Sequence, residues 1–144
     1  MDLVNITGFN LLPEVAAQLP EIASRVVRKA AFDIQHEAMV NHPFNNDTGF
    51  AENSIYVVTH DSSDYGQNLM NMSGAQKPGA ELLPEIERPS SRTTAFVAWG
   101  ANYGIYLEMG TINAPAFPTL APAAEIVRPQ FQAAMETLED QLVL

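Results

Sequence analysis

The chain has 144 residues, of which 47% are hydrophobic and 17% charged, a composition typical of one folded domain that excludes wholesale disorder. Its 17 acidic and 7 basic residues give a formal net charge of −10, which disfavours binding to nucleic acid or anionic membranes because those contacts need clustered Lys and Arg. The absence of cysteine excludes disulfides, thiolate metal sites and cysteine nucleophiles.

The first segment, MDLVNITGFNLLPEV, has neither the basic start nor the long apolar run of a signal peptide. No stretch approaches the roughly 20 apolar residues that a membrane-spanning helix needs. These two features predict a soluble intracellular protein without a membrane partner.

A long amphipathic helix is predicted from about Glu21 to Val40. Pro20 suits its first turn or would kink it, and Pro43 pushes the residue before it out of helical geometry. Apolar residues recur at spacings of three and four, as they do on one helical face. The predicted buried stripe is Val15, Leu19, Ile22, Val26, Ala30, Ile34 and Ala38.

Two β-strands are predicted after a turn-rich connection, in NSIYVVTH (53–60) and RTTAFVAWG (92–100), because both stretches are β-branched and aromatic. Residues 61–91 between them are rich in Ser, Asn, Gly and Pro, and so long a loop inside a compact domain is usually functional. We interpret it as an inserted loop that orders against a partner. Its candidate contact residues are Tyr65, Leu69, Met70, Met72, Leu82, Leu83 and Ile86.

The last third of the chain is predicted to hold two helices separated by a proline-rich segment that is extended or turning. NYGIYLEMG (102–110) suits a short helix ended by a left-handed glycine at Gly110. Pro129 would kink the final helix or start its main part. The predicted buried side of that helix is Ile126, Val127, Gln130 or Phe131, Ala134, Leu138 and Leu142.

These elements predict a single α+β domain over residues 1–144. The long N-terminal helix should pack on a small, mainly antiparallel β-sheet, with the C-terminal helix alongside and 61–91 as a long inserted loop.

Glu108, a lone carboxylate among aromatic and apolar neighbours, invites an acid–base interpretation with His42 or His60. Nothing in the sequence links it to either histidine, and no serine or threonine lies in a nucleophile elbow. A small hydrolase using Glu108 and a histidine is therefore the least favoured function. The favoured interpretation is that Glu108 binds backbone or arginine groups where segments pack.

No metal or cofactor is expected. His36, His42 and His60 lack the spacing of a zinc site. Asp61 and Asp64 in HDSSDYG resemble part of a calcium loop, but the required glycine and closing glutamate are not at the right offsets. SGAQKPGAE (73–81) lacks the spacing of a phosphate-binding loop.

Two motifs in a fixed order point to a family. The first is DTGFAENSI (47–55), which follows a helix and a proline, and the second is YGIYLEMGT (103–111) followed by APAFPTLAPA (114–123). With them the chain resembles, over roughly residues 30–142, the head–tail joining family of long-tailed bacteriophages, also called neck or tail-completion proteins. That family carries P-x-D-T-G-x-L-x-x-S-I, then Y-A-x-x-x-E-x-G-T leading to A-x-P-F-x-x-P-A. The matching residues are Pro43, Asp47, Thr48, Gly49, Ser54, Ile55, Tyr103, Glu108, Gly110, Thr111, Phe117, Pro122 and Ala123.

The chain also departs from the family pattern. Phe50 and Ala51 replace a Leu-Arg-like pair, Pro43 and Asp47 are further apart, and Gly104 stands where alanine is common. The proline-rich segment is longer than usual. Neck ring, tail terminator and minor tail protein all remain open as subfamilies.

The resemblance implies a structural virion protein rather than an enzyme, made in the bacterial cytoplasm and located at the head–tail interface. Copies would form a closed ring, six- or twelve-fold, that contacts a portal-side connector ring and the tail-tube proteins. DNA would pass through the lumen without sequence-specific binding, and an acidic lumen suits that passage. The alternative is a soluble binding or scaffolding module that stays monomeric.

The motifs also suggest roles for their residues. Asp47 and Thr48 should hydrogen-bond the backbone of the turn that Gly49 closes, directing a strand that starts near Asn53. Glu108 should brace the two motifs, through the amides near Thr48 or through an arginine of a neighbouring subunit.

Overall fold

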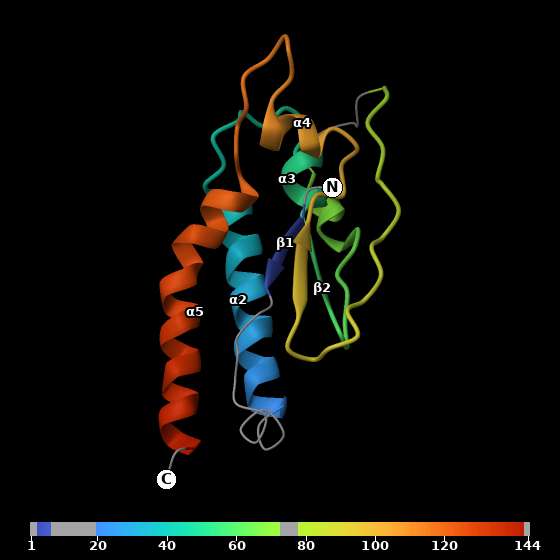
Figure 1. The fold of residues 1–144 in the computed structure, drawn as a ribbon. Helices are drawn as coiled ribbons and strands as arrows, with labels where there is room; N and C mark the ends of the chain where they lie inside the picture. Colours follow the sequence, from blue (N-terminus) through green and yellow to red (C-terminus); the bar gives the residue numbers. More distant parts are fainter. Residues whose placement is uncertain (1–2, 7–19, 73–77, 143–144) are drawn as a thin grey trace.

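The structure is a computed structural model that describes residues 3–6, 20–72 and 78–142 (Figure 1). It contains two long helices, three short strands and three single-turn or two-turn helices, so the predicted α+β class is confirmed. In chain order the elements are β1 (Leu3–Ile6), α2 (Pro20–Val40), α3 (Phe50–Ser54), β2 (Tyr56–Thr59), the 3-10 helix η1 (Gln67–Asn71), β3 (Ala95–Ala98), α4 (Gly104–Met109) and α5 (Leu120–Leu142).

The sheet has three antiparallel strands in the order β1-β3-β2. Val97 of β3 lies opposite Val4 on one side and Val57 on the other. The sequence predicted β2 and β3, whose runs are β-branched and aromatic. It did not predict β1, because LVNI is not part of a longer β-branched and aromatic run of the kind that marks β2 and β3.

Two helices cover one face of this sheet. α2 and α5 run antiparallel side by side, and α2 lies against the strands (Figure 1). The main core lies between them, where α2 residues such as Ala31 and Ile34 meet Val97 of β3 and Leu120 and Val127 of α5. The predicted packing of the long first helix on the sheet is therefore confirmed.

The other face of the sheet is covered by the 61–91 loop. Tyr56, Val58 and Ala98 are buried there, with Tyr65 and Ile86 of the loop packed against them. The Tyr56 hydroxyl accepts a hydrogen bond from the amide of Ile86 at 3.1 Å. Both faces of β2 are thus buried, which explains why its sequence, YVVT, is hydrophobic without a polar alternation.

The helix α2 has nearly the predicted bounds and begins at Pro20, where the missing amide hydrogen is not needed. Its predicted stripe is correct towards the C-terminal end but rotated at the start. Ala23 and Val27 are buried there, whereas Ile22 is 39% exposed. The reason is that α2 packs against α5 as well as the sheet, so it buries a wider arc than one stripe. The predicted residues Val15 and Leu19 lie outside the described residues.

The helix α5 contains Pro129 within it and bends in the half that holds this proline (Figure 1). Of its predicted buried side, Val127 and Leu138 are buried and Phe131 is partly buried. The prediction that Ile126 is buried was wrong, since it is exposed to solvent. Gln130, the alternative to Phe131, is exposed as well. Leu120, Ala123 and Met135, which the prediction did not include, are buried on the same face as Val127 and Leu138, whereas Ala134 is only partly buried.

The prediction of a strand starting near Asn53 was wrong. The short helix α3 occupies residues 50–54, and β2 begins only at Tyr56. Local side-chain bonds close this helical turn: Thr48 Oγ1 accepts from the amide of Phe50 at 3.2 Å, and Asn53 Nδ2 donates to the carbonyl of Gly49 at 2.9 Å. Gly49 itself has φ of 84°, so the predicted turn role of this glycine is borne out. Polar side chains that bond nearby backbone override strand propensity here.

Asp64 ties the sheet edge to the first helix. Its Oδ1 accepts from the amide of Val57 at 2.7 Å, and its Oδ2 accepts from Gln35 Nε2 at 2.8 Å. Gln35 is buried and also donates to the carbonyl of Ile55 at 3.0 Å. A residue considered as part of a calcium loop therefore closes the edge of β2, which blocks pairing with another strand.

Replacing Asp64 with alanine should lower the free energy of unfolding by about 2 kcal/mol, because it leaves the Val57 amide without its acceptor and removes one of the two acceptors of Gln35 Nε2. The matched control is Asp61→Ala in the same turn. Asp61 is exposed and bonds only its neighbour His60 through its side chain among the described contacts, so we expect a much smaller change than for Asp64→Ala. Urea unfolding followed by circular dichroism measures both, and equal effects would contradict the role given to Asp64.

Candidate functional site

Glu108 has four hydrogen-bond donors around its carboxylate. One is the indole Nε1 of Trp99 at 3.2 Å. The others are three consecutive backbone amides at the start of α5: Thr119 at 3.1 Å, Leu120 at 2.9 Å and Ala121 at 3.3 Å. Glu108 therefore caps α5 from another segment of the chain.

One carboxylate is enough to accept from all the amides at the start of α5 that lack an acceptor within the helix. The first amides of a helix have no intrahelical acceptor, and here the ladder begins with the Ala123 amide bonding the Thr119 carbonyl at 3.3 Å. Pro122, just before it, has no amide hydrogen to satisfy. Glu108 thus accepts from the amides of Thr119, Leu120 and Ala121, and Pro122 has none to offer. The charge of Glu108 also complements the positive end of the helix dipole.

The described contacts of the Glu108 carboxylate are to Trp99 and to the start of α5, and none of them is to the turn near Thr48. Glu108 therefore joins parts of the structure, but through other groups than the predicted amides; the predicted bond to an arginine of a neighbouring subunit stays a prediction. The sequence could not show this, because the contact depends on how the segment between α4 and α5 reverses.

Gly110 produces that reversal. The prediction of a left-handed glycine holds for φ, which is positive at 77°. The ψ of 176° is extended rather than left-handed helical, and this combination of φ and ψ is essentially restricted to glycine. A Cβ there would lie 2.8 Å from the amide nitrogen of Ala116. Beyond it, the Phe117 amide donates to the Leu107 carbonyl at 2.6 Å, which brings the chain back to α4 and delivers Thr119 to Glu108.

The two sequence motifs meet at this end of the molecule. The turn Asp47–Gly49 of the first motif and Tyr103 of the second line one open pocket of about 430 Å³. The rings of Phe50 and Tyr103 lie 6.1 Å apart beside it. Asparagine side chains and Asp47 supply the polar part of its described lining, which includes no Lys or Arg to bind a phosphate.

None of the described contacts of the histidines is to Glu108. His42 stacks on Phe44 with ring centroids 3.9 Å apart, its Nδ1 lies 2.8 Å from the Phe44 carbonyl, and its Nε2 lies 3.0 Å from Glu52 Oε1. His36 is exposed on α2. The pairing of Glu108 with a histidine, which the hydrolase interpretation required, is not among the contacts of the described residues.

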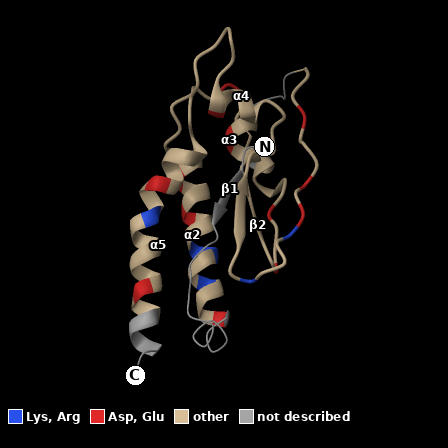
Figure 2. Cartoon of the chain, viewed as in Figure 1, with Lys and Arg blue, Asp and Glu red and all other residues tan. Residues whose placement is uncertain are grey.

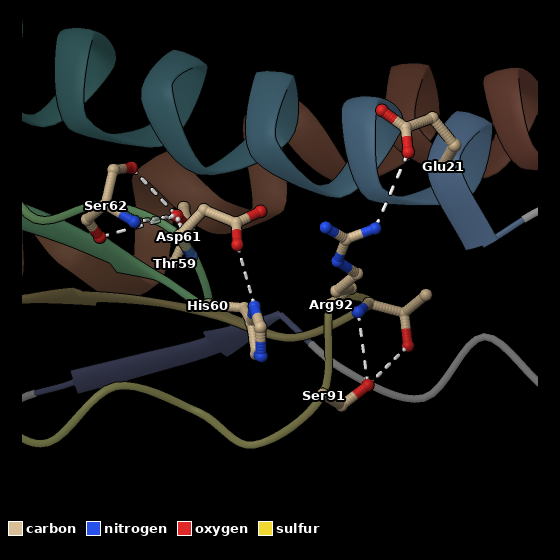
Figure 3. Close-up of polar contacts among 8 residues, drawn as sticks. Glu21, Thr59, His60, Asp61, Ser62, Ser91 and Arg92 are labelled. Carbon is tan, nitrogen blue, oxygen red and sulfur yellow. Dashed lines mark hydrogen bonds and ion pairs between the residues drawn. The ribbon is translucent and has the colours of Figure 1, made fainter.

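His60, Asp61 and Ser62 form a second polar cluster, at the end of β2 (Figure 3). His60 Nδ1 lies 2.9 Å from Asp61 Oδ1, and this hydrogen bond holds the pKa of Asp61 below its usual range. Ser62 Oγ lies 2.8 Å from Thr59 Oγ1 and points away from His60, so these residues do not form a nucleophilic relay (Figure 3). Within the described ranges, no group of three or more His, Cys, Asp or Glu side chains could hold a metal ion.

The lowered pKa of Asp61 determines in which direction its contribution to the stability of the fold changes with pH. Because its ionised form is favoured in the folded chain, it stabilises the fold above the usual carboxyl pKa near 3.8, and this contribution is lost as the pH falls. The side chain is exposed, so solvent weakens the effect.

The candidate loop residues divide into two groups. Five of them pack on their own chain: Leu69, Met72 and Leu82 against the cluster that contains Phe50, and Tyr65 and Ile86 against the cluster that contains Tyr56. The Tyr65 hydroxyl also donates to the carbonyl of Leu83. The described parts of the loop, 61–72 and 78–91, therefore pack on their own chain. Two of the predicted contact residues are exposed, Met70 at 91% and Leu83 at 43%.

The sequence interpretation missed a larger exposed apolar region on α4 and the loop that follows it. We call it the α4 surface; its residues are Ile105, Tyr106, Met109, Ile112 and Phe117, all exposed. The loop 111–118 projects from the end of the molecule and carries no charged side chain (Figure 2). A signal existed in the sequence, since Glu108 is the one charged residue between Arg92 and Glu125, and its carboxylate turns inward.

Within the described part of the chain, no helix has both the length and the apolar character that crossing a membrane requires. Comparison with known protein families, with curated proteins and with solved structures finds no match to this chain.

Proposed function

We propose that the chain is a structural protein of the head–tail junction of a tailed bacteriophage, acting as a neck, tail-completion or tail-terminator ring. The observation that supports this most is the meeting of the two motifs at one end of the fold. Asp47–Gly49 and Tyr103 line one pocket, and Glu108 of the second motif caps the helix that contains Pro122. The motif residues therefore stabilise the conformation of this end of the fold. Such a role suits a structural protein.

Glu108 illustrates the difference between a scaffold and a reacting group. Its carboxylate is fully occupied by four donors within 3.3 Å, which suits a cap and leaves little capacity for a substrate. Gly110 likewise has a structural role, since the Cβ of any other residue at this position would clash with the backbone of Ala116.

The charge of the chain supports the same proposal. A net charge of −10 suits a channel through which DNA slides, because attractive contacts to phosphates would hold the DNA. The α4 surface provides the other requirement of a ring, an apolar area that a neighbouring subunit can cover.

Imaging purified phage particles by electron cryomicroscopy, with the chain fused to a small tag, tests this proposal. The expected result is a closed ring of tagged copies between the portal side of the capsid and the tail tube, with the DNA path through its centre. Absence of the chain from particles would overturn the proposal. Attachment as single copies would do so too, and would favour the alternative of a monomeric binding or scaffolding module.

A further inference from the structure

We propose that His42 is a pH-sensitive latch on the connection 41–49 between α2 and α3. A ring that carries hydrogen on both nitrogens holds this connection against α3, and loss of one of these protons releases it. The inference does not depend on the proposed function.

Both nitrogens of the His42 ring face an oxygen that can only accept. Nδ1 lies 2.8 Å from the carbonyl oxygen of Phe44, and Nε2 lies 3.0 Å from Oε1 of Glu52 on α3. A neutral imidazole carries one N–H and can donate to only one of these oxygens. The two hydrogen bonds therefore exist together only when the ring carries both hydrogens and a positive charge.

The surroundings of the ring favour that charge. The side chains of His42 and Glu52 are 10% and 25% exposed, so solvent screens their attraction less than that of a surface pair. The ring of Phe44 stacks on the imidazole with centroids 3.9 Å apart and an interplanar angle of 14°. The face of an aromatic ring attracts a cation at this distance.

The elements packed around this position bring further acids to it. Glu37 of α2 accepts from the neighbouring Asn41 at 2.8 Å, and Asp47 lies on the connection itself. Glu108 of α4 is bonded by Trp99, on which Phe44 packs. Among the described residues, no Lys or Arg contacts the His42 ring: the cations of α2 lie in its first half, and that of α5 pairs with an acid on its own helix.

Loss of one proton to solvent turns one of the two contacts into a repulsion. When Nε2 keeps its hydrogen for Glu52, the lone pair of Nδ1 faces the Phe44 carbonyl oxygen at 2.8 Å, and the two atoms must separate. Phe44 then moves with its carbonyl. Its ring lies 6.0 Å from that of Trp99, and it lines the open pocket together with the turn Asp47–Gly49. Deprotonation therefore frees the first motif from the end of β3.

The fluorescence of Trp99 tests this latch, because Trp99 is the chain's one tryptophan and packs against Phe44. Its emission is measured between about pH 5 and pH 8, the range in which histidine side chains change charge. The hydrogens on the two His42 nitrogens are followed over the same range by ¹⁵N NMR of the ring. We expect one transition in emission that coincides with the loss of a His42 hydrogen, and we expect it to be absent from His42→Asn.

His60→Asn is the matched control. His60 also lies 2.9 Å from an acid, Asp61, but this pair is exposed and follows β2 at the end remote from α3. The Trp99 transition should therefore be unchanged in His60→Asn. Glu52→Gln is a second variant that keeps the histidine and an oxygen able to accept from Nε2. Because it removes the negative charge, it should move the transition to lower pH.

Three results would overturn the inference. One is a Trp99 transition that persists in His42→Asn or is lost in His60→Asn. Another is an emission that stays constant while His42 titrates. The third needs no variant and holds even if His42→Asn does not fold: an NMR spectrum in which the His42 ring carries a single hydrogen over the whole pH range.

Discussion

Replacing Glu108 with glutamine is expected to lower the free energy of unfolding by about 2 kcal/mol, and with alanine by about 3 kcal/mol. Glutamine keeps one acceptor oxygen but turns an NH₂ group towards amides that themselves donate. It also removes the charge that complements the start of α5. Alanine leaves the indole of Trp99 and the amides of Thr119, Leu120 and Ala121 without an acceptor from the chain.

The matched control for this change is Glu125→Gln on the surface of α5. Glu125 is exposed and pairs with Arg128 at 2.8 Å, so its loss should change stability by less than about 0.5 kcal/mol. Urea unfolding of the three variants, followed by tryptophan fluorescence and circular dichroism, measures the difference. Trp99 reports directly, because it donates to Glu108 and is the chain's one tryptophan. If Glu108→Gln and Glu125→Gln proved equally mild, the capping role would be wrong.

If the proposed ring exists, the same change should reduce its assembly. The reversal that Glu108 stabilises carries the loop 111–118, and a frayed start of α5 would release one end of that loop. Assembly lost at temperatures where the Glu108→Gln chain remains folded would separate this effect from global unfolding.

The long elements of the fold could be predicted because their signals are repeated. α2 has a proline at its start, a proline soon after its end and a sustained apolar period, and its bounds were nearly right. β2 and β3 are runs of β-branched and aromatic residues. The elements that were missed or misassigned are β1, α3 and η1. They lack such a signal, so local bonds or pairing with a distant strand decide their structure.

The candidate site could be predicted in its residues but not in its contacts. The resemblance identified Glu108, Gly110 and Pro122, yet their common purpose depends on the reversal at Gly110, which brings residues eleven and more positions apart into contact. The exposed face of α4 was missed for a different reason. Apolar residues at helical spacing normally indicate a buried face, and only the tertiary structure shows that nothing in the described chain covers Tyr106 and Met109.

Gly104 stands where the pattern that this chain resembles commonly has alanine, and the structure gives a physical reason for glycine there. A Cβ added there would lie 2.4 Å from Cγ and 2.5 Å from Cβ of Trp99. Alanine, the common residue of the pattern, therefore cannot fit at this place without moving α4 away from the end of β3. Gly104→Ala should lower the free energy of unfolding by about 3 kcal/mol, the upper end of what overpacking normally costs. Thermal and urea unfolding measure it.

Two controls identify the cause of that loss. Gly79→Ala has no atom within 4 Å of the new Cβ, but φ is +87°, so it should show only the backbone penalty of about 1 kcal/mol. Gly104 is not among the glycines with positive φ, so its loss should come from contact alone. Adding Trp99→Phe to Gly104→Ala should not restore stability, because the Cβ of residue 99 remains 2.5 Å away. A stable Gly104→Ala chain would contradict this account. A loss would mean that the close approach of the residue 99 side chain, from its Cβ outward, is the reason this chain requires glycine at position 104.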